Sequence, residues 1–181
     1  MPMKKSTLRA FRDLTPAVVS LLETLEADSE LRVGFLDELV KGLARERYTL
    51  AQNLLSACPG PTVTSTETDL RTSISRSYYF CHHACRAVLI SKSRHDFKGH
   101  QDVVERIKKL ARTDAAWTRC SRAIAALLDR RHSADYDPFD DGGSSTRFSV
   151  VTPEDDMKAI QAMVTDVKTQ VETFLRNARV I

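Results

Sequence analysis

Apolar residues recur along much of the chain every three or four positions, which is the spacing of one face of an α-helix. Thr15 followed by Pro16 predicts a helix start, because threonine caps helices and proline suits their first turn. Further helices are predicted from the apolar stripes at 36–55, 68–92, 103–111, 117–131 and 157–175. The alternation typical of strands occurs only briefly, at 148–151. The pattern therefore predicts an all-α protein, an up-and-down bundle of about five or six helices.

Composition adds limits to this picture. The 181 residues suit one domain, and no stretch reaches the roughly 18–20 apolar residues that a membrane span needs. The first twelve residues lack the apolar core of a secretory signal, and none of the four cysteines forms a C-x-x-C pair. We therefore expect free thiols, a cytoplasmic location and no membrane association.

The net charge of the whole chain is only +3. Any attraction for a phosphate-rich partner must therefore come from a local basic patch. An ordinary solvated surface is the alternative interpretation of the same charge balance.

The helix predicted at 68–92 has two chemically different faces. At 100° per residue, one narrow arc holds Arg76, Tyr79, His83 and Arg86. The opposite, mainly apolar side holds Tyr78, Cys81, Cys85 and Leu89. Arginine binds phosphate through a planar fork, histidine can move protons near neutrality, and tyrosine can stack on a base. The alternative is that the tyrosine and histidine are hydrogen-bonded structural residues and the arginines are paired with acids.

Metal binding is a further interpretation of the same helix, since Cys81, His82, His83 and Cys85 are all of ligand type. Only the two cysteines share a face well, and the sequence offers no second ligand pair at zinc spacing. Buried cysteines are also common in helix cores. We therefore expect no metal and no cofactor.

A second polar segment follows the stripe at 117–131. Arg131 continues that stripe and is predicted to point inward, where Asp135 or Asp137 could pair with it. Such a pair could simply end the helix before Pro138, or it could hold an arginine rigid for gripping phosphate. His100, in the loop before the fourth predicted helix, could approach the same place.

These segments resemble the HEPN superfamily, in particular its small bacterial and archaeal branch. That branch shows R-x-Y-Y-x-x-x-H-A-x-R-A, then a histidine at the start of the next helix, then R-x-x-A-D-Y-D. The matching positions here are Arg76, Tyr78, Tyr79, His83, Ala84, Arg86 and Ala87, then His100, then Arg131, Ala134, Asp135, Tyr136 and Asp137. The resemblance covers about residues 36–177. It implies a HEPN-like bundle at 36–181 and an N-terminal extension with one helix at 1–35.

The resemblance also implies a function. Many HEPN proteins are metal-independent ribonucleases that act as toxins or in phage defence, and small relatives are often paired with a nucleotidyltransferase. The expected partners are RNA or a nucleotide, a nucleotidyltransferase or antitoxin, and a second copy in a homodimer. We expect catalytic roles for Arg76, His83 and Arg131. Substrate-binding roles are expected for Tyr79, Arg86, His100, Asp135 and Tyr136.

The chain departs from the catalytic pattern at one point. Active HEPN ribonucleases carry R-x(4–6)-H near the end of the helix that here ends with Arg131. Tyr136 stands at the first position where that histidine is expected, while His132 directly follows the arginine. A non-catalytic module that binds RNA, a nucleotide or a partner is therefore the main alternative, and a purely structural helical dimer is another.

Overall fold

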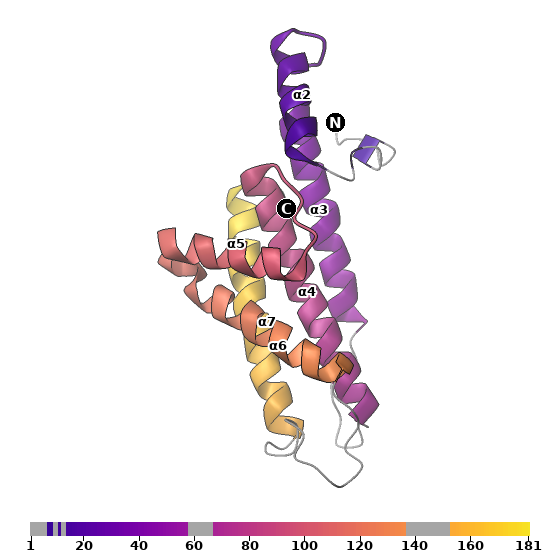
Figure 1. Ribbon diagram of the computed structural model, residues 1–181, viewed down its shortest axis with the longest axis vertical. Helices are drawn as coiled ribbons and strands as arrows, with labels where there is room; N and C mark the ends of the chain where they lie inside the picture. The colour runs from indigo at the N-terminus through magenta and orange to yellow at the C-terminus, as the bar shows by residue number, and fades with distance from the viewer. Residues whose placement is uncertain (1–6, 9–10, 12–13, 58–66, 137–152) are drawn as a thin grey trace.

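The computed structural model confirms the all-α architecture (Figure 1). It describes residues 7–8, 11, 14–57, 67–136 and 153–181. Within these ranges there is no strand, and the brief alternation at 148–151 lies outside them. The described helices are α2 (Pro16–Ala27), α3 (Phe35–Ser56), α4 (Glu67–Ser93), α5 (His100–Thr113), α6 (Thr118–Tyr136) and α7 (Pro153–Asn177), with a 3₁₀ turn η1 (Ala115–Trp117) before α6.

Helix starts follow the capping residues of the sequence. The Thr15 hydroxyl accepts a hydrogen bond from the Val18 N–H at 3.3 Å and so caps α2. Asp114 accepts from the Ala116 N–H at 3.0 Å. It therefore caps the short η1 turn, which then leads into α6, rather than capping α6 itself.

α4 is the central helix and packs against α3, α5, α6 and α7. Figure 1 shows α3, α4 and α7 along the long axis of the molecule, whereas α5 and α6 run across it. Residues 84–90 of α4 are all buried, which is expected for a helix covered from several directions. Polar side chains on α4 consequently lie inside the protein, where burial changes their chemistry.

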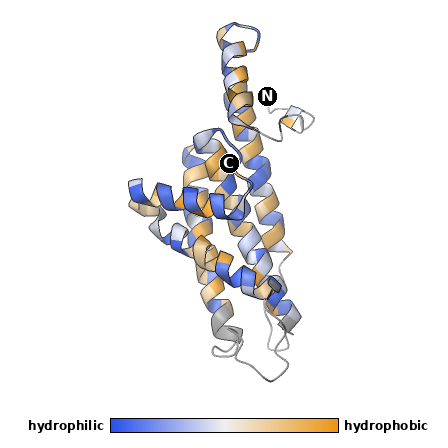
Figure 2. Cartoon of the chain, in the orientation of Figure 1, coloured by the Kyte–Doolittle hydropathy of each residue, from blue (hydrophilic) through white to orange (hydrophobic). Residues whose placement is uncertain are grey.

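The crossing helices have one buried and one exposed side. Val103, Val104 and Ile107 are the buried residues of α5, and polar residues cover its outer side (Figure 2). Because α5 and α6 cross α4, they bring His100 at the start of α5 and Arg131 near the end of α6 towards the middle of α4.

The helix predicted in the N-terminal extension is α2, which lies on α3 at one end of the molecule (Figure 1). Ion pairs from Arg94, the residue that follows α4, to Glu23 at 2.9 Å and to Asp37 at 3.1 Å hold this end of the molecule together. The Glu26 carboxylate also accepts from the Leu36 N–H at 2.7 Å. The domain boundary at residue 35 stays a prediction.

Candidate functional site

Arg131 is the centre of a polar contact between α6 and α4. Its side chain is buried, with the residue 9% exposed. Its Nη2 donates to the Tyr79 hydroxyl at 3.2 Å, and its guanidinium carbon lies 5.5 Å from the centre of the Tyr79 ring. The inward orientation expected from the apolar stripe is thus confirmed.

Asp135 is the acid that holds this arginine. Arg131 Nε and Asp135 Oδ2 form an ion pair of 2.6 Å one helical turn apart. The Ser75 hydroxyl donates to the other oxygen of Asp135 at 2.5 Å, which joins the pair to α4. Asp137, the other expected partner, lies outside the described residues.

Next to Arg131 lies a group of rings that we call the tyrosine–histidine cluster: Tyr78, Tyr79, His82, His83 and His100. The His83 ring stacks on Tyr79 with centroids 6.5 Å apart, and the His100 ring lies 5.8 Å from Tyr79. His82 and His100 are closer still, at 4.7 Å. α4 and α5 therefore bring all five rings together beside the guanidinium from α6.

The Tyr78 hydroxyl connects the histidines of the two helices. It shares a hydrogen bond of 2.8 Å with His100 Nδ1 and a longer one of 3.4 Å with His82 Nδ1. Burial raises the pKa of Tyr78 well above its ordinary value, so the hydroxyl keeps its proton at neutral pH. Placing Tyr78 on the apolar side of the helix was therefore only half right, since its ring is buried but its hydroxyl reaches the site.

The three histidines of the cluster are neutral at pH 7. Burial, with the nearby His83 and His100, lowers the pKa of His82 to about 2. Burial, with the charges of Arg86 and Arg47, lowers the pKa of His83 to about 4. The pKa of His100 is also lowered, first by burial and then by Arg131. Neutral imidazole has a nitrogen that can accept a proton, which a general base requires.

His83 has an uncommitted nitrogen. Its Nδ1 atom is buried and has no hydrogen-bond partner among the residues that the structure describes. This nitrogen can therefore accept a hydrogen bond or a proton from a group brought to the cluster.

Arg86 has a different environment from the one expected of a substrate-binding residue. It is buried, and its Nε and Nη2 atoms donate to the Asp96 carboxylate with contacts of 2.7–2.9 Å. Arg47 of α3 adds a second contact to the same carboxylate at 3.1 Å. Two positive charges thus share one negative charge, and the excess contributes to the low pKa of His83.

Arg76 lies further towards the start of α4. It donates to the backbone carbonyl of Ala57, at the end of α3. It also lines an open pocket of about 440 Å³ beside the Arg131–Asp135 pair. The pocket is lined by Thr68, Arg71, Thr72, Ser75, Arg76, Tyr79 and Asp135. The structure thus places Arg76 and Tyr79 on the same pocket, whereas His83 and His100 contact the Tyr79 ring but are not among the residues that line the pocket.

Some residues of the site were not predicted. His82 is three residues after Tyr79 and four after Tyr78, so helical spacing alone could have added it. Arg71 donates to the carbonyls of Ser133 and Ala134 at 3.2 and 2.9 Å and so holds the end of α6 on α4. Tyr136 ends α6, and its side chain lies outside the described part of the chain.

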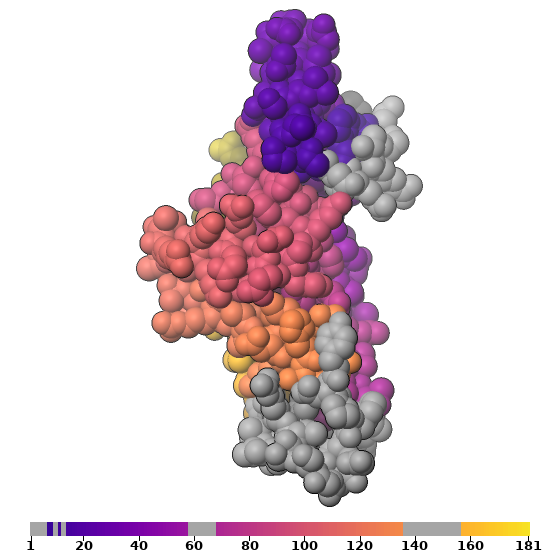
Figure 3. Space-filling model, in the orientation of Figure 1, coloured from indigo at the N-terminus to yellow at the C-terminus, as the bar shows by residue number. Residues whose placement is uncertain are grey.

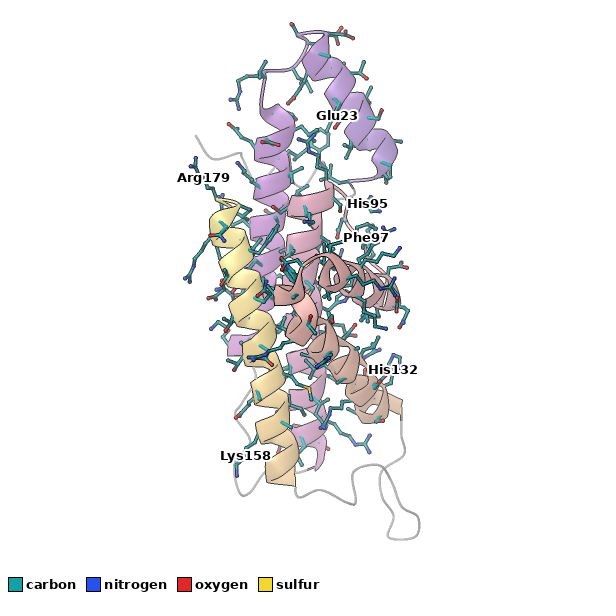
Figure 4. All side chains as sticks on the ribbon, turned by 90° about the vertical axis from the view of Figure 1, so that its left-hand side faces the viewer. Glu23, His95, Phe97, His132, Lys158 and Arg179 are labelled. Atoms are coloured by element: carbon teal, nitrogen blue, oxygen red, sulfur yellow. The ribbon has the colours of Figure 1, made fainter. Side chains whose placement is uncertain are left out.

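The residues considered as metal ligands do not gather into one group. Cys81, Cys85 and Cys120 are free and buried. Burial raises the pKa of the Cys81 thiol, and the contact with the Cys120 thiol, together with burial, raises the pKa of the Cys85 thiol. His132 is exposed on α6 (Figure 4), and His95 packs edge-on to Phe97 at 4.4 Å. Among the described residues, no cluster of three or more histidine, cysteine or acidic side chains could hold a metal ion.

The lowered histidine pKa values predict loss of stability in acid. The unfolded chain takes up these protons near pH 6.5, whereas folded His83 takes up its proton only near pH 4. The contribution of neutral His83 to the free energy of unfolding is therefore complete above pH 6.5, and it is lost as the pH falls to 4. At about 1.4 kcal/mol per pKa unit, the loss should reach several kcal/mol.

Urea denaturation between pH 7 and pH 4 measures this effect. The His83→Asn variant should lose less stability than the wild type over the same interval. An unchanged pH dependence in that variant would show that His83 does not titrate as described.

No helix in the described part of the chain is long and apolar enough to cross a membrane. The family model described as "HEPN domain" matches residues 63–177, which is more than half of the chain. Neither the curated proteins nor the solved structures gave a match.

Proposed function

The chain belongs to the HEPN family, and from this premise we propose that it cleaves RNA as a metal-independent endoribonuclease. HEPN domains often bind RNA and form dimers, and the family suggests a function on RNA or nucleotides in general. The observation that carries the proposal is the meeting of Arg131, His83 and His100 around Tyr79. These residues come from three helices, and together they offer a phosphate-binding fork and two neutral imidazoles.

The cluster has the groups that RNA cleavage requires. His83 accepts the proton of a ribose 2′-hydroxyl, whose oxygen then attacks the adjacent phosphorus. The bond from phosphorus to the 5′-oxygen breaks, giving a 2′,3′-cyclic phosphate and a 5′-hydroxyl. Arg131 stabilises the negative charge that develops on the phosphate oxygens.

His100 is suited to donate a hydrogen bond to the leaving 5′-oxygen, which takes its proton from solvent water because this imidazole is neutral at pH 7. With the Tyr78 hydroxyl as hydrogen-bond donor to His100 Nδ1, the hydrogen of the neutral imidazole lies on Nε2. Tyr79 offers a ring for stacking beside the attacked phosphate, while Arg76 serves the neighbouring nucleotide in the pocket. Asp135 holds the Arg131 fork in place.

A specific observation also favours a second function, that of a non-catalytic module paired with a nucleotidyltransferase. The R-x(4–6)-H spacing of active relatives would place histidine at positions 136–138, where this chain has none. The Arg131 guanidinium instead pairs with the carboxylate of Asp135. An arginine already neutralised binds phosphate less strongly than a free one. In this function the same pocket binds RNA or a nucleotide without cleaving it.

We place the protein in a toxin–antitoxin or phage-defence system, in which it acts as a homodimer in the cytoplasm. An antitoxin or a nucleotidyltransferase is the partner that would restrain it. Co-purification with such a partner from the native host would test this setting.

Incubation of the purified protein with total RNA and transfer RNA in EDTA tests the proposed function. The ribonuclease proposal predicts discrete fragments, and it predicts none from the folded His83→Ala variant. Intact RNA with a folded, RNA-binding wild type contradicts cleavage and favours the binding module.

A further inference from the structure

Positive charge is concentrated in one part of the fold. The 25 residues from Lys98 to Arg122 hold seven lysines and arginines and three acidic residues, a net charge of +4. The whole chain has +3, so all other residues together sum to −1. The local basic patch that phosphate binding would require is thus found on α5, η1 and the start of α6.

Five exposed cations make up this patch, which we call the basic face: Arg106, Lys109, Arg112, Arg119 and Arg122. None of them forms a salt bridge with any residue in the described ranges. Lys108 differs, since it pairs with Glu105 at 2.8 Å. Arg32, an exposed arginine elsewhere, is also paired with an acid, Glu38. The unpaired charges of the basic face therefore remain available to an anionic partner.

The two helices form adjoining parts of one surface. In Figure 3, α5 and α6 lie side by side over the middle of the molecule. The buried residues Val103, Val104 and Ile107 fix which side of α5 faces inward, and the cations lie on its other sides. Arg106 lies over the Phe97 ring at 4.7 Å, at the end of the face nearest the site.

The basic face leads away from the tyrosine–histidine cluster. His100 begins α5, and Arg112 lies twelve residues further, about 18 Å along the helix axis. Arg119 and Arg122 lie near the start of α6, and Arg131 lies near the end of the same helix. A strand whose cleaved phosphate lies at Arg131 can therefore place several flanking phosphates along this surface.

We propose that the basic face binds the phosphate backbone of single-stranded RNA flanking the cleavage position, so that the substrate is a polynucleotide rather than a dinucleotide. This inference rests on the proposed function. Cations spaced along two adjoining helices fit a chain of phosphates, because each contact releases condensed counterions without requiring a particular base.

The test is binding of a fluorescein-labelled single-stranded RNA with 2′-O-methyl riboses, which cannot undergo attack by the 2′-oxygen. Anisotropy titrations with the full chain compare the wild type with Lys109→Glu/Arg112→Glu. The variant should weaken binding at least about tenfold and flatten the slope of log K against log salt by about 1.4, since each single-strand contact contributes about 0.7. The neutral variant Lys109→Gln/Arg112→Gln should have an intermediate effect.

The matched control is Lys92→Glu/Lys168→Glu, which changes net charge equally at exposed lysines of α4 and α7. It should bind RNA almost as the wild type does. Equal weakening by both double variants would overturn the proposal, because the effect would then be one of total charge. Binding to phosphatidylserine vesicles but not to the RNA would overturn it in favour of a membrane.

The same titration separates this inference from the proposed function. If Lys109→Glu/Arg112→Glu binds the RNA as tightly as the wild type and the wild type cleaves natural RNA, only the role of the basic face is overturned. Binding that depends on the basic face without cleavage overturns the ribonuclease proposal alone.

Discussion

Replacing Asp96 by asparagine is expected to lower the free energy of unfolding by about 3–5 kcal/mol, the usual cost of leaving a buried charge without its partner. The Asp96 carboxylate accepts from Arg86 and Arg47, and its backbone N–H donates to the Leu14 carbonyl at 3.4 Å. It therefore connects α3, α4, the loop before α5 and the segment before α2. Asparagine has nearly the same shape but cannot neutralise either arginine.

Urea denaturation at pH 7 measures the loss. Glu38→Gln is the matched control, since it removes the carboxylate of an exposed pair with Arg32. Little change is expected there, because solvent screens such a pair. If Asp96→Asn is as stable as Glu38→Gln, the buried ion pairs do not hold these helices together as described.

Replacing Arg131 by alanine is expected to reduce the rate of RNA cleavage about 10²–10³-fold, the usual effect of removing a group that stabilises transition-state charge. Arg131 is held on one side by Asp135 and on the other by Tyr79. Arg131→Lys keeps the charge but lacks the planar fork, so it should recover only part of the rate. Single-turnover cleavage of a labelled RNA measures both.

Two controls separate chemistry from folding. Circular dichroism and thermal melting establish that each Arg131 variant is folded. Arg32→Ala removes an exposed arginine from the segment between α2 and α3 and should cleave RNA at the wild-type rate. Full activity of folded Arg131→Ala would remove this residue from the site.

The helices were predictable from the sequence because apolar residues recur along them at helical spacing. Thr15 and Pro16 predicted the start of α2, and the inward turn of Arg131 followed from its place after the apolar residues of α6. The crossing of α5 and α6 over α4 was not predictable in this way. Periodicity fixes which side of a helix is buried but not the angle at which two helices pack.

The same limit applies to the site. Helical spacing placed Tyr79 and His83 on one arc, and it placed Tyr78 on the apolar side. The contact of the Tyr78 hydroxyl with His100 could not be predicted, since His100 is on another helix. Asp96 lies in the loop before α5, where no periodic pattern marks a buried residue. The Asp96 carboxylate forms an ion pair with Arg86. Arg86 was expected to bind substrate because it shares a helical arc with Tyr79 and His83, but in the fold it pairs with this acid.

The most direct test of the central claim is the chemical nature of the RNA ends left by the wild-type protein in EDTA. Attack by the 2′-hydroxyl at the tyrosine–histidine cluster predicts 2′,3′-cyclic phosphate and 5′-hydroxyl ends, lost together in folded Arg131→Ala. Fragments with 5′-phosphate and 3′-hydroxyl ends, or the same cyclic ends at full yield from that variant, would contradict the account.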